Sequence, residues 1–364
     1  MTTSVQAGHL TEIYRVENLP IFQNRMFLTA AEARNCAKGD VLLVQDQNTG
    51  LIFNKRFQPE LMQYDSSYQN EQAVSGVFRG HLRSVASVIE RHFSGQSLIE
   101  VGCGKGNFLE LLQAAGFNIT GLDPTYEGSN PAVMKRYFSP EIGLHADGII
   151  LRHVLEHVQN PVEFLQHMRD ANGGKGKIYI EVPCLDWICE HRAWFDIFYE
   201  HVNYFRLTDF YRMFGIVHEA GHVFAGQYLY VVADLSSIRS PIFDEPRPFS
   251  FPEDFLGTVD RHAQWLQTQG SRSTAIWGGA SKGVIFALFM RRAGAQIDLV
   301  FDINPAKHGK YLPSTGLLVQ SPERAIELLP RGANVFVMNG NYLQEIAGST
   351  NNQFNYVTVD HECI

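Results

Sequence analysis

The run SLIEVGCGKGN, residues 97–107, constrains this chain of 364 residues more than any other segment. Apolar and β-branched residues lead to the acidic Glu100. Glycines then alternate at Gly102, Gly104 and Gly106, and an apolar helical pattern follows at once. Glycine allows a tight turn in which the backbone comes close to a ligand, because it has no Cβ. The run therefore predicts a strand, a ligand-contacting turn and a helix.

A second predicted strand, residues 118–122, ends in the carboxylate of Asp123, about 20 residues after the turn. In a doubly wound sheet such a carboxylate is placed to hold ribose hydroxyls. The turn lacks the Gly-x-Gly-x-x-Gly spacing that brings a helix N-terminus onto a pyrophosphate. The pattern from Glu100 to Asp123 resembles instead two motifs of the class I S-adenosylmethionine (SAM) methyltransferases, whose cofactor is a sulfonium without phosphates. Nicotinamide binding and a turn kept for packing alone are the alternatives.

Charge and composition limit the partners that this chain can have. The formal net charge is −8, and a partner bound through phosphates would require a basic face, so we expect no nucleic acid. The N-terminus has no apolar core of the signal-peptide type, and no run approaches about 18 apolar residues, so we expect no membrane partner. Five scattered cysteines without a Cys-x-x-Cys pair indicate reduced thiols in the cytoplasm. The expected partner is a small-molecule substrate, and the expected assembly is a monomer or a homodimer.

Strand and helix patterns alternate within residues 91–240, which predicts a parallel sheet with helices on both faces. Residues 1–90 form a small N-terminal lobe, which we expect to cover the active site. After a cluster of prolines, residues 241–364 repeat the alternation around a second glycine turn, residues 278–283. We therefore expect an α/β fold with a doubly wound methyltransferase sheet and a second, Rossmann-like C-terminal domain. The strands expected in the central domain are 97–101, 118–122, 147–151, 177–182 and 228–234.

Two polar clusters follow predicted strands and are expected at the ligand edge of the sheet. The first has the sequence RHVLEH and follows the strand 147–151. Its place predicts that the backbone of Arg152 and His153 lies beside the cofactor and that His157 faces the acceptor. Two packed and hydrogen-bonded histidines are the simpler interpretation, and a zinc site is weak because no third ligand follows at metal spacing.

The second cluster spans residues 195–205 and follows the strand 177–182. Its adjacent Glu200 and His201 lie between aromatic residues, which exclude water. A carboxylate beside an imidazole in such surroundings suits proton transfer. An aromatic packing cluster with a buried polar pair is the alternative.

Three blocks resemble the sugar C-methyltransferases that act on nucleotide-linked deoxy-keto-sugars. They are the glycine turn with Asp123, the run from Ile180 to Phe205, and the C-terminal WGGASKG and FDINPAKHGKYLP runs within residues 277–313. The resemblance covers roughly residues 40–364. It implies SAM as cofactor, held by the glycine turn, Glu100, Asp123 and Arg152. It also implies that a base removes a proton next to a ketone and that the enolate attacks the sulfonium methyl.

The resemblance also implies roles by position. His201 would be the base, Glu200 its partner, and His157 a group that helps to hold the sugar or enolate oxygen. Further contacts to the acceptor would come from Tyr64 and Tyr68 of the N-terminal lobe, from His153 and Tyr199, and from Lys282 at the nucleotide diphosphate.

The chain departs from the family's pattern in three places. The family usually binds zinc through cysteine pairs in the N-terminal lobe, and the second pair would fall near Asp46 and Thr49, where there is no cysteine. We therefore expect no zinc and no other metal. Phe198 stands where a tyrosine is common, and His153 where an asparagine is usual. The leading expectation remains C-methylation, with O-methylation of a related sugar or small metabolite as its variant. An NAD(P)-dependent oxidoreductase and a non-catalytic sugar-nucleotide sensor are the alternatives from other classes.

Overall fold

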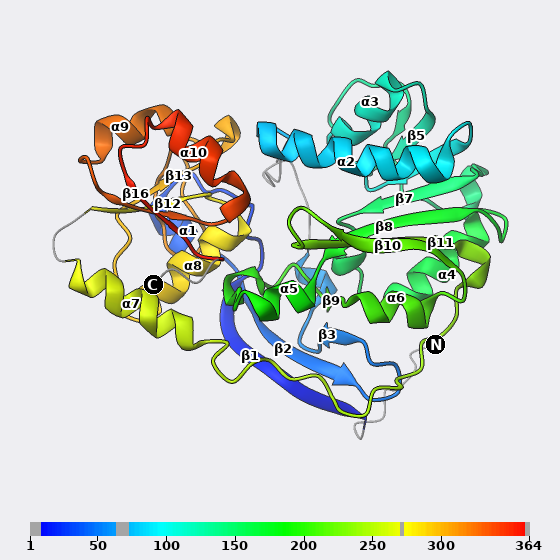
Figure 1. Cartoon of the computed structure of the whole chain (residues 1–364), viewed down its shortest axis with the longest axis horizontal. Helices are drawn as coiled ribbons and strands as arrows, with labels where there is room; N and C mark the ends of the chain where they lie inside the picture. The colour runs from blue at the N-terminus through cyan, green and yellow to red at the C-terminus, as the bar shows by residue number, and fades with distance from the viewer. Residues whose placement is uncertain (1–8, 63–72, 270–272, 361–364) are drawn as a thin grey trace.

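The computed structural model describes residues 9–62, 73–269 and 273–360 as three sheets with their helices (Figure 1). The central sheet and its helices lie on the right of the view, and the C-terminal unit lies on the left. The N-terminal strands β1 (Leu10–Pro20) and β2 (Lys38–Asp46) run beneath both. Within the described ranges, no helix is long and apolar enough to cross a bilayer.

The central sheet has seven strands in the order β10-β11-β8-β7-β4-β5-β6. Strands β4 to β8 pair in parallel, whereas β11 is antiparallel to both of its neighbours. The expected doubly wound α/β sheet is confirmed, and the hairpin of β10 and β11 completes its edge. The strands are β4 (Ser97–Val101), β5 (Asn118–Leu122), β6 (Val133–Met134), β7 (Gly148–Arg152), β8 (Lys177–Pro183), β10 (Val217–Val223) and β11 (Tyr228–Asp234), and the helices are α2 (Gly76–Phe93), α3 (Asn107–Ala114), α4 (Pro161–Ala171), α5 (Leu185–Glu190) and α6 (Leu207–Met213).

Helix α2 packs on this central sheet. Its buried residues Phe78, Leu82 and Val85 share one apolar cluster with Leu98 of β4 and Ile150 of β7. Burial of such side chains contributes roughly 1.5–3 kcal/mol each, which fixes the helix to the sheet. The expected boundary at residue 90 therefore falls inside a helix that packs with the central domain.

The N-terminal sheet is antiparallel, in the order β1-β2-β3-β9. Its last strand, β9 (Asn203–Tyr204), comes from the central domain and follows directly after the Glu200–His201 pair. The N-terminal lobe is therefore joined to the second polar cluster through backbone hydrogen bonds. Its other elements are β1 (Leu10–Pro20), α1 (Ala30–Arg34), β2 (Lys38–Asp46) and β3 (Ile52–Asn54).

The C-terminal domain has a five-stranded sheet in the order β14-β13-β12-β15-β16, and all of its pairs are parallel. It packs on the central domain through aromatic rings, with Trp194 stacked on Phe286 at 5.7 Å between ring centroids. Its strands are β12 (Thr274–Trp277), β13 (Leu299–Phe301), β14 (Val319–Gln320), β15 (Asn334–Val337) and β16 (Asn355–Thr358), and its helices are α7 (Gly257–Thr268), α8 (Ser281–Arg292), α9 (Ala325–Leu328) and α10 (Leu343–Ser349).

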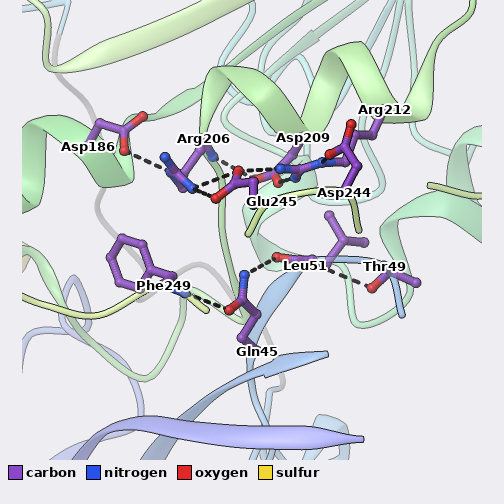
Figure 2. A network of polar contacts seen from close by, with 11 residues as sticks. Gln45, Thr49, Leu51, Asp186, Arg206, Asp209, Arg212, Asp244, Glu245 and Phe249 are labelled. Carbon is purple, nitrogen blue, oxygen red and sulfur yellow. Dashed lines mark hydrogen bonds and ion pairs between the residues drawn. The ribbon is translucent and has the colours of Figure 1, made fainter. Parts of the chain in front are cut away.

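The segment that leads from the central to the C-terminal domain is bound along its length (Figure 2). Arg206 forms ion pairs with Asp186 at 2.8 Å and with Glu245 at 3.0 Å, and Arg212 also binds Glu245. Further along, the backbone N–H of Phe249 donates to the side chain of Gln45 in β2 over 2.8 Å. The connecting segment therefore links all three parts of the molecule.

Candidate active site

A cavity of about 220 Å³ lies where the three parts of the molecule meet. Two hydrogen bonds between domains connect residues of its lining, one from Ser75 Oγ to Glu345 Oε2 (3.1 Å) and one from Asn339 Nδ2 to Gln227 Oε1 (2.7 Å). Its lining residues include Asn24 of the N-terminal lobe, His153, Glu156, His157, Asp196, Phe198, Glu200, His201 and Tyr228 of the central domain, and Gly278, Lys282, Asp302, Lys307 and Asn339 of the C-terminal domain.

The glycine turn after β4 has the backbone that the sequence predicts. Gly102, Gly104 and Gly106 have φ angles of 74°, 54° and 83°, a region that favours glycine. A Cβ on Gly102 would lie 2.5 Å from the side chain of Val154, whereas a Cβ on Gly104 would meet no atom within 4 Å. The turn is therefore packed on one side and open at Gly104, as a turn that cradles a ligand must be.

Asp123 closes the same turn from the end of β5. Its carboxylate accepts hydrogen bonds from the backbone N–H of Gly104 (2.9 Å) and of Thr125 (2.8 Å). The acid that is expected to hold ribose hydroxyls thus lies beside the open glycine.

Glu100 lies at the end of β4 and is buried, and its Oε2 has no hydrogen-bond partner among the described residues. Burial raises the pKa of Glu100 to about 7, although the Arg152 guanidinium opposes the shift. A buried carboxylate of this kind is stabilised by a cation that comes close to it. The unpaired oxygen, the open Gly104 and the acid at position 123 fit SAM, which carries a sulfonium and an ammonium but no phosphate.

Arg152 and His153 both bind Glu181 of β8. Arg152 Nε lies 3.3 Å from Glu181 Oε2, and the guanidinium lies over the ring of Phe108 at 4.6 Å from its centroid. Burial raises the pKa of Glu181, but Arg152, His153 and His81 outweigh that effect and hold it well below its usual range. The side chain of Arg152 is therefore held by Glu181 and Phe108, and the expected contact with the cofactor would come from its backbone.

His153 has a φ of 53°, which is uncommon for a residue with a side chain. Its Nε2 lies 3.1 Å from Glu181 Oε1 and its Nδ1 3.4 Å from Glu156 Oε1. Burial lowers the pKa of His153, but the two carboxylates outweigh it and raise the pKa to about 9. His153 lines the cavity as an imidazolium, and its ring edge packs on Tyr228 with 4.6 Å between the ring centroids.

His157 and His201 meet at the cavity wall, with 5.0 Å between their ring centroids. His157 Nδ1 donates to the backbone carbonyl of Glu200 over 2.8 Å. Burial lowers the pKa of His201 well below its usual range, and His157, His153 and Lys282 lower it further. His201 is therefore a neutral imidazole, which is the form that can accept a proton.

Glu200 lies next in sequence to His201 and is buried. Its Oε1 accepts a hydrogen bond of 2.6 Å from the backbone N–H of Gln23. This bond connects the second polar cluster to the N-terminal lobe, and Asn24, the next residue of that lobe, lines the cavity.

Tyr199 was expected to contact the acceptor, but its side chain does not line the cavity. Its ring is fully buried against Phe57 and Gly39, and its phenol oxygen accepts from the backbone N–H of Gln58 at 2.9 Å. Its neighbours Phe198 and Glu200 line the cavity, whereas the side chain of Tyr199 packs in the N-terminal lobe. Tyr64 and Tyr68, which were also expected at the acceptor, lie outside the described residues.

Lys282 lies at the start of α8 and lines the cavity. Its Nζ lies 3.1 Å from Asp196 Oδ2 and 4.7 Å from the ring centroid of Trp187. The C-terminal domain thus places an ammonium group in the cavity that also contains the two histidines.

The hairpin between β2 and β3 occupies the place of the second cysteine pair. Asp46 Oδ1 accepts from the backbone N–H of Asn48 at 2.8 Å, and Thr49 Oγ1 accepts from that of Leu51 at 3.3 Å. Side-chain hydrogen bonds therefore hold this turn.

The sequence interpretation missed Glu156 as a member of the site. A carboxylate oxygen of Glu156 and one ring nitrogen each of His157 and His201 lie within 4.8 Å of one another. An acid next to a histidine after a strand was the available signal, but only the folded turn Leu155–His157 shows that its side chain lines the cavity.

Comparisons with known proteins match both domains. Residues 69–221 match a methyltransferase domain, and residues 258–356 match the C-methyltransferase C-terminal domain. The chain is similar to the C-methyltransferase NovU of Streptomyces niveus, with 23% identity over 306 residues, 72% of this chain and 72% of NovU.

Two solved structures similar to the chain are SAM-dependent methyltransferases. One is from Archaeoglobus fulgidus (20% identity, TM-score 0.34, 43% of this chain and 96% of that chain). The other, from Thermotoga maritima, is described as a possible histamine N-methyltransferase (16% identity, TM-score 0.33, 43% of this chain and 91% of that chain). Together with the cofactor turn, the domain matches identify the chain as a SAM-dependent methyltransferase.

Proposed function

We propose that this enzyme methylates a carbon next to the ketone of a nucleotide-linked deoxy-keto-sugar. The observation that carries the proposal is the shared cavity: it places the neutral imidazole of His201 and the ammonium of Lys282, from different domains, around one volume. A keto-sugar needs a base for its acidic C–H, and its nucleotide diphosphate needs a cation. A methyltransferase without the C-terminal domain would lack the cation that Lys282 provides.

In the proposed mechanism, His201 removes the proton next to the ketone. His157 helps to hold the oxygen on which the negative charge develops, because a donor aimed at that oxygen stabilises the transition state. Glu100, Gly104 and Asp123 hold the cofactor, which supplies an electrophilic methyl group when it is bound. Methyl transfer itself depends chiefly on in-line positioning of the acceptor carbon and the methyl group. The domains therefore contribute by fixing the acceptor carbon next to the cofactor that the glycine turn holds.

O-methylation of a hydroxyl on a related sugar is the second candidate. The neutral His201 can also accept a hydroxyl proton. The ring next to it is Phe198, at 4.0 Å between centroids, without the phenol that the family commonly has. The two candidates differ in the bond that forms, and one experiment separates them.

The experiment incubates the enzyme with nucleotide-linked keto-sugars in deuterium oxide without SAM, and then with SAM labelled with ¹³C in the methyl group. We expect deuterium at the carbon next to the ketone, and the labelled methyl on the same carbon by ¹³C–¹H correlation. His201→Ala should abolish both, whereas His145→Ala, at an exposed loop residue, should change neither. A labelled methyl ether without deuterium exchange would contradict C-methylation and establish the O-methyl alternative.

A further inference from the structure

The carboxylate of Glu156 is the least compensated acid of the cavity wall. The residue is 1% exposed, and neither Oε1 nor Oε2 has a hydrogen-bond partner among the described residues. A buried carboxylate without hydrogen bonds is costly, because it has lost its solvation and gained little in return. Such a group indicates that a further positive charge or donor arises next to it.

The turn that carries Glu156 is firmly held. The backbone carbonyl of Glu156 accepts from the N–H of Val202 at 2.8 Å, and the side chain of Asn203 donates to the carbonyl of Leu155 at 3.3 Å. The turn that carries the Glu156 side chain is therefore fixed to the second polar cluster, next to His201.

The positive charge next to Glu156 does not belong to Glu156 alone. His153 lies 3.4 Å away, but its charge is shared with Glu181 at 3.1 Å. The other close groups are His157 and His201, each with a ring nitrogen within 4.8 Å of a carboxylate oxygen of Glu156. One of these two, His201, is the imidazole to which the proposed mechanism delivers a proton.

His201 needs a negative charge nearby once it has accepted that proton. It is buried among aromatic rings, and the nearby cations His153 and Lys282 oppose a positive charge on it. An imidazolium in such surroundings is stabilised chiefly by a close carboxylate. One carboxylate oxygen of the adjacent Glu200 accepts a hydrogen bond of 2.6 Å from the backbone N–H of Gln23. That oxygen is therefore already bound to the N-terminal lobe.

We propose that Glu156 is a positioning residue that acts through His201, as the carboxylate that stabilises the imidazolium formed during catalysis. This inference rests on the proposed function. In the step concerned, the acceptor C–H bond breaks, its proton forms an N–H bond on His201, and its electron pair remains on the acceptor as the enolate. After methyl transfer, the imidazolium beside Glu156 releases the proton to solvent, and the site returns to its starting charge.

The test compares Glu156→Gln, which keeps the shape and removes the charge, with Glu156→Asp, which keeps the charge. Glu163→Gln, at an exposed residue of α4, is the matched control. We expect Glu156→Gln to lower kcat by about 100-fold, in the range typical of proton-transfer groups, while KM for the acceptor and Kd for S-adenosylhomocysteine change less than about threefold. Glu156→Asp should recover at least a tenth of the lost rate, and the control should equal the wild type.

Three results would overturn the proposal: full activity of Glu156→Gln, equal losses in the Gln and Asp variants, or a rise in KM that accounts for the whole effect. A rate that EDTA abolishes and a divalent cation restores would also overturn it, because the three side chains would then hold a metal. Circular dichroism and the Tm of each variant show whether it folds. Failure of the wild type to exchange the acceptor proton would count against C-methylation alone, since the Gln-to-Asp contrast can be read from any methyl transfer that the enzyme performs.

Discussion

His157 Nδ1 donates a hydrogen bond to the backbone carbonyl of Glu200 over 2.8 Å, and this bond joins the two polar clusters of the site. The clusters follow β7 and β8, which are neighbours in the sheet, so their residues meet at one edge. Because a carbonyl only accepts, the bond places a proton on Nδ1, and His157 can donate to the oxygen of the acceptor only when Nε2 carries a second proton. The bond also sets the ring of His157 beside that of His201.

Removal of this bond should affect turnover more than cofactor binding. We expect His157→Ala to lower kcat by about 100-fold, because both the fixed ring and its proposed contact with the acceptor oxygen are lost. The Kd of S-adenosylhomocysteine, measured by calorimetry, should change less than about threefold, since the glycine turn lies at a different strand end. A comparable loss in both quantities would place His157 in the cofactor site.

Glu100→Gln should stabilise the apo-enzyme at high pH and weaken its cofactor binding. The folded-state pKa of Glu100 is raised to about 7 by burial, so its ionisation costs stability progressively as the pH rises from about 4.5 to above 7. At pH 8 the neutral amide should raise the free energy of unfolding by roughly 2–3 kcal/mol, and at pH 4.5 it should change it little. Urea unfolding at both pH values measures the effect.

The same variant should bind S-adenosylhomocysteine and SAM at least about tenfold more weakly at pH 8, because an ionised acid that faces a cation is lost. Glu110→Gln, on an exposed position of α3, is the control for both measurements. Unchanged affinity together with increased stability would remove Glu100 from the cofactor site and leave it as a residue of the core.

The sequence predicted the cofactor turn well, because backbone requirements there are local. Alternating glycines with positive φ angles, an acid before them and an acid after the next strand are all readable without tertiary structure. Strands β12 and β15 of the C-terminal sheet were also readable, since each is a buried parallel strand in which three apolar residues follow one polar residue.

Features that depend on packing between lobes were less predictable. The strand β1 (Leu10–Pro20) has an irregular apolar pattern, because register shifts interrupt its pairing with β2 and only a few of its side chains are buried. The burial of Tyr199 follows from the space that Gly39 leaves in that same lobe. Glu156 entered the site because a turn after β7 is tied to residues near position 202, a pairing that no local pattern encodes.

His153→Asn should remove a pH-dependent part of the stability. The folded-state pKa of His153 is about 9, above its unfolded value near 6.5, so its contribution is fully present below pH 6.5 and is lost as the pH rises through 9. The wild type should lose about 2–3 kcal/mol more than the variant between these pH values, by urea unfolding. Asparagine tolerates the positive φ at this position, so backbone strain should not obscure the result. Parallel pH dependences would show that His153 is neutral.

The ion pairs of Glu245 should stabilise the connecting segment more than the ion pair of Asp244 does. Both acids bind Arg212, but the side chain of Glu245 is 26% exposed and also binds Arg206, whereas that of Asp244 is 77% exposed (Figure 2). We expect Glu245→Ala to lower the free energy of unfolding by about 1–3 kcal/mol, because Arg206 and Arg212 both lose a partly buried partner, although Arg206 keeps Asp186 and Arg212 keeps Asp209. Asp244→Ala should cost less than about 0.5 kcal/mol. Faster proteolysis within residues 239–256 should accompany the first variant, and equal effects of the two would contradict this ranking.

Lys282→Met should separate acceptor binding from chemistry. Methionine keeps the unbranched stem against Trp187 but removes the ammonium, whose Nζ lies 4.7 Å from that ring centroid and 3.1 Å from Asp196. If the ammonium binds the nucleotide diphosphate, KM for the acceptor should rise at least about tenfold, since hydrogen bonds to charged groups contribute about 1.5–3 kcal/mol. The Kd of S-adenosylhomocysteine should stay unchanged, and Lys282→Arg should recover part of the affinity because a guanidinium also binds phosphate. The double variant Lys282→Met, Asp196→Asn tests whether the exposed negative charge alone causes the loss. Recovery of the wild-type KM in that double variant would show that Lys282 serves to neutralise Asp196 and that the diphosphate lies elsewhere.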